Sequence, residues 1–338
     1  MSSAAALKAV VLEEARRLGF ACAGIAPAET SPRAGRFQRF VELGLHAEMA
    51  YLGRDPAARA DPRRLLAGAA SVICLAVSYA PSDGDASAGL IARYARGRDY
   101  HRLLRVRCRK LLEVLSARAP ALRGRICVDT APVLERDLAA SAGLGWIGRN
   151  GCLVNRRWGS YLLLAEIIVD VPLPPDEPVA NGCGSCRRCL RACPTGAIRE
   201  DGLVDSRRCI GYLTIEHRGN LPEELCSTIG RRVFGCDACQ EVCPYNRAVP
   251  AGDGELRGPS ALARTPLAEL LAWDQADWDR LTRGSAARRA TWEMFLRNAA
   301  VAAGNTGQAH LRPHLHRLAG HPAGEVARAA RWALHQKP

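Results

Sequence analysis

The chain has 338 residues, which is long enough for two or three domains with hydrophobic cores of their own. Apolar residues make up 48% of it and charged residues 24%, so the composition excludes a disordered or a collagen-like chain. The formal net charge of +13 favours a polyanionic partner such as nucleic acid. Codon bias could account for the use of arginine instead of lysine, but it does not explain the excess of basic over acidic residues.

The sequence carries only weak signals for export, for a membrane span or for disulfide bonds. The pair Arg16-Arg17 resembles a twin-arginine signal, but two glutamates precede it and Pro27 ends the apolar run that follows. The longest apolar run, 162–169, is too short to cross a bilayer. We therefore expect a cytoplasmic protein with no membrane partner. Six cysteines are scattered singly and fit a reducing compartment: Cys22, Cys74, Cys108, Cys127, Cys152 and Cys226.

Apolar periodicity predicts alternating helices and strands over residues 1–170. We expect helices at 4–18, 37–43, 100–117 and 134–142, and strands at 20–26, 71–79, 125–128 and 161–169. Alternation of this kind is typical of an α/β domain.

The rest of the chain divides into two further segments. The proline-rich stretch 171–178 blocks both helix and strand and marks a linker, and the glycines at 251–254 mark the next boundary. Residues 260–338 are expected to be helical, and within them 297–303 aligns with 328–334, which resembles short HEAT-type repeats. We predict an α+β multidomain fold with domains at 1–172, 173–252 and 253–338.

Cysteine spacing carries the strongest functional signal. Residues 183–194 read Cys-Gly-Ser-Cys-Arg-Arg-Cys-Leu-Arg-Ala-Cys-Pro, and a shorter copy occupies 236–244. In bacterial ferredoxins three thiolates of such a run hold one [4Fe–4S] cluster, and the fourth binds the other cluster. Cys209 lies between the copies and can replace the cysteine that the second copy lacks. The spacing predicts a bacterial ferredoxin-like domain with two clusters.

Eight cysteines divide between the two predicted clusters. One cluster takes Cys183, Cys186, Cys189 and Cys243, and the other takes Cys193, Cys209, Cys236 and Cys239. A pair of zinc sites is the alternative, because zinc sites also use cysteines separated by two residues. Zinc sites rarely need a third close cysteine, a crossing fourth and a following proline, so the pattern favours iron–sulfur clusters.

Two shorter patterns do not support the sites that they resemble. Gly143-Leu-Gly145-Trp-Ile-Gly148 has the spacing of a dinucleotide-binding loop, but it follows a predicted helix instead of a strand. We interpret these glycines as tightly packed backbone that lies against a flat cofactor. Asp99-Tyr-His101 begins like the motif of proteins that bind cobalt through histidine, but Leu104 occupies the place of its glycine.

Several longer stretches together resemble the epoxyqueuosine reductase family. They are 94–101, 128–135, 142–150, 209–216 and 297–305, and with the two cysteine runs they follow the family's order from about residue 5 to the end of the chain. Gly211 and Tyr245 depart from the residues usual in the family, but neither is a predicted ligand. The resemblance implies that the N-terminal α/β domain binds cobalamin.

The same resemblance implies an oxidoreductase that completes queuosine biosynthesis. Such an enzyme reduces the epoxide of epoxyqueuosine in the tRNA anticodon loop to queuosine, with cobalamin and with electrons that two [4Fe–4S] clusters relay. An external electron donor of the flavodoxin or ferredoxin type is implied, and we expect a monomer. Asp129 matches the family's proton donor, and burial against the corrin would raise its pKa. The alternative for Asp129 is a turn or helix-cap residue.

Further site residues follow from the matching segments and from charge. The resemblance implies cobalamin contacts at Met49, Tyr51, Arg63, Tyr94, Asn150, Asn155 and Ser160, without a histidine on the cobalt. Basic side chains predict tRNA contacts at Arg207, Arg208, Arg218, Arg231, Arg232, Arg312, Arg317 and Arg328. Two alternatives remain at this point: a reductive dehalogenase-like enzyme, and a non-enzymatic iron–sulfur protein for electron transfer or tRNA binding.

Overall fold

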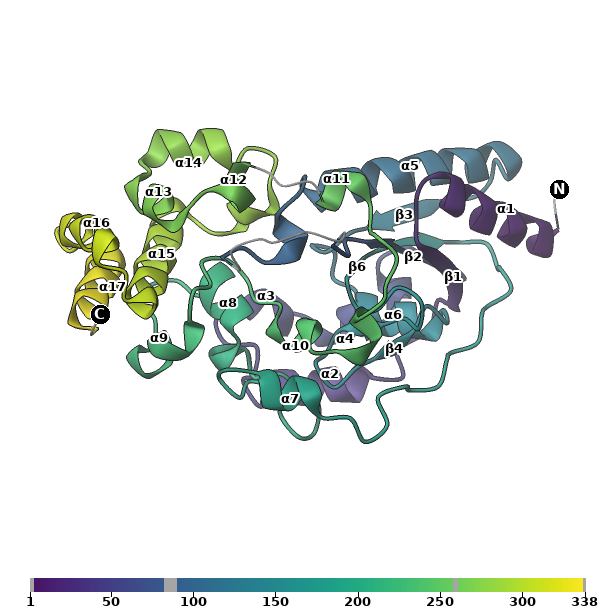
Figure 1. Cartoon of the computed structure of the whole chain (residues 1–338). Coiled ribbons are helices and arrows are strands. Elements are labelled where there is room, and N and C mark those ends of the chain that lie inside the picture. Colours follow the sequence, from purple (N-terminus) through teal and green to yellow (C-terminus); the bar gives the residue numbers. More distant parts are fainter. Residues whose placement is uncertain (1–2, 82–89, 258–260, 337–338) are drawn as a thin grey trace.

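The computed structural model describes residues 3–81, 90–257 and 261–336 (Figure 1). A four-stranded sheet forms the centre of the N-terminal part, with strands β1 (Cys22–Pro27), β2 (Ser71–Ser78), β3 (Gly124–Cys127) and β6 (Leu162–Val169). The strand order is β1-β2-β6-β3, and each neighbouring pair is antiparallel. The alternation along the chain is as predicted, but the α/β assignment is wrong. Sequence order does not determine strand direction, and antiparallel pairing makes this region α+β.

Helices cover both faces of this sheet. Helices α1 (Ala4–Arg17) and α5 (Tyr100–Arg118) pack on one face, and α6 (Glu135–Ser141) packs on the other. All eight residues of β2 are buried as a result, which explains why its sequence is almost continuously apolar. The predicted helices and strands of this region agree with the structure to within a few residues at each end. Short helices α2 (Ala34–Glu42), α3 (Ala50–Gly53) and α4 (Pro56–Ala60) complete it.

The glycines of the dinucleotide-like pattern lie in a small hairpin of β4 (Trp146–Ile147) and β5 (Leu153–Val154). A Cβ atom on Gly145 would lie 2.2 Å from the Val154 carbonyl oxygen, so only glycine fits there. Gly143 has φ 73° and packs against the carbonyl of Glu177 in the linker. The tight backbone is therefore as expected, but these two glycines pack against the protein's own chain.

The segment with the cysteine runs contains only short helices. They are α7 (Arg188–Ala192), α8 (Ile210–Ile215), α9 (Glu223–Ile229) and α10 (Ala238–Glu241). Helices α7 and α10, which belong to the first and second cysteine runs, pack against each other. The linker before them is anchored to the sheet, because Asp176 accepts hydrogen bonds from the Ile25 amide at 2.9 Å and from Lys8 at 2.6 Å.

The described C-terminal residues 261–336 are largely helical, as predicted, whereas 260 and 337–338 lie outside the described residues. Helices α11 (Gly254–Arg257), α12 (Ala261–Arg264), α13 (Leu267–Ala272), α14 (Gln275–Leu281), α15 (Trp292–Thr306), α16 (Arg312–Leu318) and α17 (Gly324–His335) follow in order. The two segments related by the repeat fall in α15 and α17, which pack closely at Gly304 and Ala333. Along the described residues, no helix combines the length and apolarity that a membrane span requires.

Arg297 joins this helical part to the cysteine-rich part. Its side chain is completely buried and donates hydrogen bonds to the carbonyl oxygens of His217, Gly219 and Leu213 at 3.0, 2.6 and 2.8 Å. The neighbouring Asn298 donates to two more carbonyls of the same part. The matching stretch at 297–305 therefore serves domain packing, and Arg297 itself is not accessible to a nucleic acid.

Candidate active site and cluster sites

The first predicted cluster site is assembled from both cysteine runs. The thiol groups of Cys189 and Cys243 each lie close enough to Cys183 and Cys186 for their charges to interact. Cys189 lies on α7 and Cys243 follows α10, so the packing of these two helices brings the runs together. The Trp146 indole donates a hydrogen bond to the Cys183 sulfur at 3.4 Å. Donors of this kind stabilise the thiolates of an iron–sulfur cluster.

The second predicted site has a separate group of cysteines. Cys209 interacts electrostatically with Cys193 and Cys236, and Cys239 interacts with Cys209 and Cys236. The amide of Ala197 donates to the Cys193 sulfur at 3.3 Å. In the part of the chain that the structure describes, no three potential ligands converge on one point as they do around a single metal ion. A cubane does not require such convergence, because each of its thiolates binds a different iron at its own corner.

A ninth cysteine lies beside the second group. Cys152 forms a hydrogen bond with Cys239, and its charge also interacts with Cys209 and Cys243. The sequence analysis placed it among the scattered cysteines. No spacing rule could have identified it, because it comes from the loop between β4 and β5 and reaches the cluster region only through the fold.

A hydrogen-bonded cluster of acid–base groups lies where β3 ends. Asp129 follows this strand with a left-handed backbone at φ 54°, which aspartate tolerates better than most residues. His101, in the first turn of α5, places Nε2 at 2.9 Å from Asp129 Oδ2 and Nδ1 at 2.7 Å from Asp99 Oδ1. Asp99 also caps α5 by accepting from the His101 amide at 3.0 Å. The imidazole is thus held between two carboxylates.

Asp129 does not cap a helix with its side chain. The next helix, α6, begins at Glu135 without a side-chain cap, and the Asp129 carboxylate binds His101 instead. The Asp129 amide donates to Glu135 Oε1 at 2.5 Å, which connects a third carboxyl group to the row of Asp99, His101 and Asp129. The helix-cap alternative for Asp129 is therefore wrong.

The proton distribution in this cluster differs from the expectation for Asp129. The hydrogen bond from His101 holds the pKa of Asp129 below its usual value, although its partial burial opposes this. Burial disfavours a charged His101, but its bonds to Asp129 and Asp99 outweigh that effect and raise its pKa to about 9. Burial and the nearby Asp129 charge raise the pKa of Glu135 to about 7. At neutral pH the row therefore holds its proton on His101.

Side chains of the cysteine-rich part and of the C-terminal helical part also lie near this cluster. Arg289 binds Glu216 through its Nε at 2.6 Å, and the guanidinium also lies over the Tyr51 ring, 5.7 Å from its centroid. Arg59 lies near the same ring at 5.8 Å. Arg289 contributes to the lowered pKa of Asp129. Arg289 and Glu216 were not predicted as residues of this site, since they are far apart in the chain and no motif links them to Asp129.

The predicted cofactor contacts separate into two groups. Tyr51 and Tyr94 both interact electrostatically with Asp129, and Met49 precedes the helix that carries Tyr51. The others make internal bonds. Arg63 pairs with Asp61 at 2.8 Å, Asn155 binds the Leu144 carbonyl at 2.6 Å, Asn150 accepts from the Cys152 amide at 3.3 Å and Ser160 binds Gln240 at 3.0 Å.

The arginines predicted to bind tRNA are spread over the cysteine-rich part and the C-terminal helices, and most have partners within the chain. Arg207 pairs with Asp205 at 2.8 Å and Arg328 with Glu223 at 3.7 Å. Backbone carbonyls accept from Arg208, Arg218, Arg232, Arg312 and Arg317. Arg231 and Arg232 line a cavity of about 270 Å³ beside Cys236.

Two groups of cysteines and a row of acid–base side chains in one chain are typical of an iron–sulfur oxidoreductase. Residues 182–246 match the family of the 4Fe-4S double cluster binding domain, which decides against paired zinc sites. Residues 59–130 match the family "Epoxyqueuosine reductase QueG, DUF1730". The chain belongs to the epoxyqueuosine reductase family.

Relatives match over most of the chain. An epoxyqueuosine reductase from Pseudomonas aeruginosa is 42% identical over 331 residues, covering 95% of this chain and 92% of the relative. One from Escherichia coli is 44% identical over 296 residues, covering 85% and 78%. A crystal structure of epoxyqueuosine reductase with a modified tRNA stem loop superposes with a TM-score of 0.90 at 31% identity, covering 97% of this chain and 89% of that one. A Bacillus subtilis structure with its catalytic aspartate loop swung out has a TM-score of 0.89 at 30% identity, with the same coverage.

Proposed function

We propose that this protein reduces the epoxide of epoxyqueuosine in the tRNA anticodon loop to the alkene of queuosine. Two electrons and two protons convert the epoxide into an alkene and water. Family membership over 95% of the chain supports this function, and a related reductase has been crystallised with an epoxyqueuosine-modified stem loop. The observation in this chain that carries the proposal is the row Asp99–His101–Asp129, which holds a proton beside a half-exposed carboxylate.

The cofactors of this reaction fit the residues present. The two groups of four cysteines hold two [4Fe–4S] clusters, and the surface around Asp129 and the exposed ring of Tyr51 receives cobalamin. Carboxylates occupy both ring nitrogens of His101, so its imidazole would not be available to bind the cobalt. When bound, cobalamin supplies a reduced cobalt nucleophile and the clusters supply single electrons. Of the other predicted contacts, Tyr94 and Met49 flank this surface.

The chain's own part in the chemistry is to deliver a proton to the departing epoxide oxygen. The Asp129 side chain is 51% exposed, whereas His101 is only 24% exposed, so Asp129 is the group that faces the substrate. His101 holds the proton at Nε2 and passes it to Asp129 Oδ2 across their 2.9 Å hydrogen bond. Asp99 orients the imidazole through Nδ1. Glu135 supplies a second acidic group behind Asp129.

The three parts of the chain divide the remaining tasks. We assign residues 1–172 to cobalamin binding and catalysis, 173–252 to the clusters and 253–338 to tRNA contact, and we interpret the C-terminal helices as HEAT-like. The substrate base must leave its stack in the loop to reach Asp129. Contacts to the tRNA backbone by Arg207, Arg208, Arg218, Arg231, Arg232, Arg312, Arg317 and Arg328 hold the stem meanwhile. An external carrier of the flavodoxin or ferredoxin type supplies the electrons.

Mass spectrometry of tRNA nucleosides from cells that lack this protein tests the function. We expect epoxyqueuosine to accumulate and queuosine to disappear, and the wild-type gene to restore queuosine. Complementation with Asp129→Asn is the matched control, and it should leave epoxyqueuosine in place. Normal queuosine in the deletion strain would contradict the proposal. It would favour the dehalogenase-like or the non-enzymatic alternative.

A further inference from the structure

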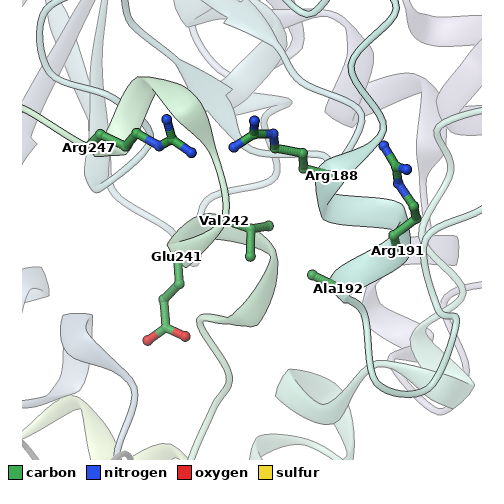
Figure 2. A pocket seen from close by; sticks show the side chains of 6 residues that line it. All are labelled: Arg188, Arg191, Ala192, Glu241, Val242 and Arg247. Carbon is green, nitrogen blue, oxygen red and sulfur yellow. The ribbon is translucent and has the colours of Figure 1, made fainter.

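A basic cavity opens on the surface beside the cluster ligands. It has a volume of about 440 Å³, and it lies between α7 and α10. Its lining consists of Arg188, Arg191, Ala192, Glu241, Val242 and Arg247. Figure 2 shows the guanidinium groups of Arg188 and Arg247 pointing toward each other from the two sides of this cavity, with Arg191 on the same helix as Arg188.

Half of the residues that line the cavity are sequence neighbours of the predicted ligands. Arg188, Ala192 and Val242 are the residues that immediately precede Cys189, Cys193 and Cys243. The cavity therefore touches chain that belongs to both cluster sites, and the cysteines themselves are partly exposed. A redox partner seated here would be separated from the clusters by little more than the two short helices.

The three arginines of the cavity are not neutralised within the chain. Across the described residues, no hydrogen bond or ion pair joins the guanidinium of Arg188, Arg191 or Arg247 to another group. Neighbouring arginines differ in this respect, since Arg187 pairs with Glu200 at 2.9 Å. The one acidic residue of the lining, Glu241, binds Arg93 at 3.4 Å. Like charges repel when they converge, so a partner with carboxylates would fit this surface well.

We propose that this cavity and its three arginines are the docking site of the external electron carrier, a small protein with an acidic face around its redox group. This inference rests on the proposed function, because that reaction consumes two electrons for each epoxide. In each encounter the carrier is oxidised by one electron and a [4Fe–4S] cluster is reduced by one. Two encounters complete the requirement, and the protons come from the acid–base row around Asp129.

The position of the cavity favours an electron carrier over nucleic acid. Helix α7 lies well apart from α16 and α17, which carry Arg312, Arg317 and Arg328 of the arginines assigned to the tRNA backbone (Figure 1). A stem contacted by these three arginines leaves the α7 surface free, so both partners can bind at once. The carrier can then supply its second electron without release of the tRNA.

Stopped-flow reduction of the cluster-loaded protein tests this proposal. The variant Arg188→Glu/Arg191→Glu is compared with Arg109→Glu/Lys110→Glu, which makes the same change in charge at exposed positions of α5, apart from α7 in Figure 1. The probe is reduced flavodoxin, and bleaching of the cluster absorbance gives the second-order rate constant. We expect the α7 variant to react at least about tenfold more slowly at low salt, with the difference shrinking as salt rises, and the α5 variant to change much less.

Three further measurements keep the outcomes distinct. Iron content and absorbance verify that both clusters are assembled, and Arg247→Glu repeats the test at a lining residue that is not adjacent to a cluster cysteine in the sequence. Reduction by the methyl viologen radical cation, which needs no basic docking site, should not slow in any variant. Equal slowing by the α5 and α7 variants, or no slowing, would overturn the proposal. Loss of stem-loop affinity in the α7 variant with normal flavodoxin kinetics would assign the cavity to nucleic acid. These readouts do not depend on epoxide turnover, so the proposed function can fail without affecting them.

Discussion

Replacement of Asp129 by asparagine removes one carboxylate from the Asp99–His101–Asp129 row and preserves its shape. Asparagine also tolerates the left-handed backbone at φ 54°, so the loop after β3 should keep its conformation. The rise in the pKa of His101 from 6.5 to about 9 corresponds to about 3 kcal/mol in favour of the imidazolium. Two carboxylates contribute to this stabilisation of the imidazolium. Because the Asp129 side chain is 51% exposed, we reduce the contribution of Asp129 for solvent screening to about 1 kcal/mol, or about one unit of the His101 pKa.

Turnover should fall by about 10²–10⁴ in Asp129→Asn, the range for loss of a general acid, which is about 3–5 kcal/mol of transition-state stabilisation. Wild-type activity should decline as the pH rises through about 9, when the proton leaves His101. The residual activity of the variant should decline at a pH about one unit lower than that of the wild type. Single-turnover assays on an epoxyqueuosine-containing stem loop, quenched and quantified by mass spectrometry, measure both effects. Near-normal turnover by a variant with full iron and cobalamin content would refute this assignment of the acid.

Four other outcomes are expected. The reconstituted protein should bind about eight irons. Cys209→Ser should disrupt one cluster selectively, whereas Cys152→Ser should keep both clusters. Iron analysis and electron paramagnetic resonance measure these outcomes. Arg297→Met should lower the free energy of unfolding by at least about 3 kcal/mol in denaturant titrations, because it leaves buried carbonyls without a donor. Arg328→Glu should weaken stem-loop binding and reduce the salt slope by about one, with little change in melting temperature. His101→Gln should flatten the pH dependence of thermal stability. The folded wild-type protein binds the His101 proton more tightly than the unfolded chain does, so this proton stabilises the fold fully below about pH 6.5. That stabilisation is lost as the pH rises through about 9.

The choice of Arg328 for the tRNA prediction follows from the structure. Arg312 and Arg317 were equally good candidates by charge, but Arg312 donates to the Leu334 carbonyl and Arg317 to the Leu271 carbonyl. Reversal of either charge would therefore disturb the packing of the C-terminal helices as well as any contact with tRNA. Arg328 is paired only across 3.7 Å with an exposed Glu223, so its replacement leaves the fold largely intact.

The sequence by itself predicted the secondary structure closely and predicted a domain with two [4Fe–4S] clusters, which the family match over residues 182–246 confirms. Cluster ligands are recognisable because short chemical spacings, such as two residues between Cys186 and Cys189, are dictated by the size of the cluster and not by the rest of the fold. Helices such as α5 and strands such as β2 were predictable because burial on one or both sides produces a periodic or a continuous apolar pattern.

Only the tertiary structure decided the features that depend on contacts between distant segments. Strand direction in the sheet, the burial of Arg297 and the position of Cys152 beside Cys239 all arise from packing that no local pattern encodes. The same is true of the proton on His101. Its pKa depends on two carboxylates, one in its own helix cap and one at the end of β3, and the expected rise in the pKa of Asp129 became a fall because its nearest partner is a cation.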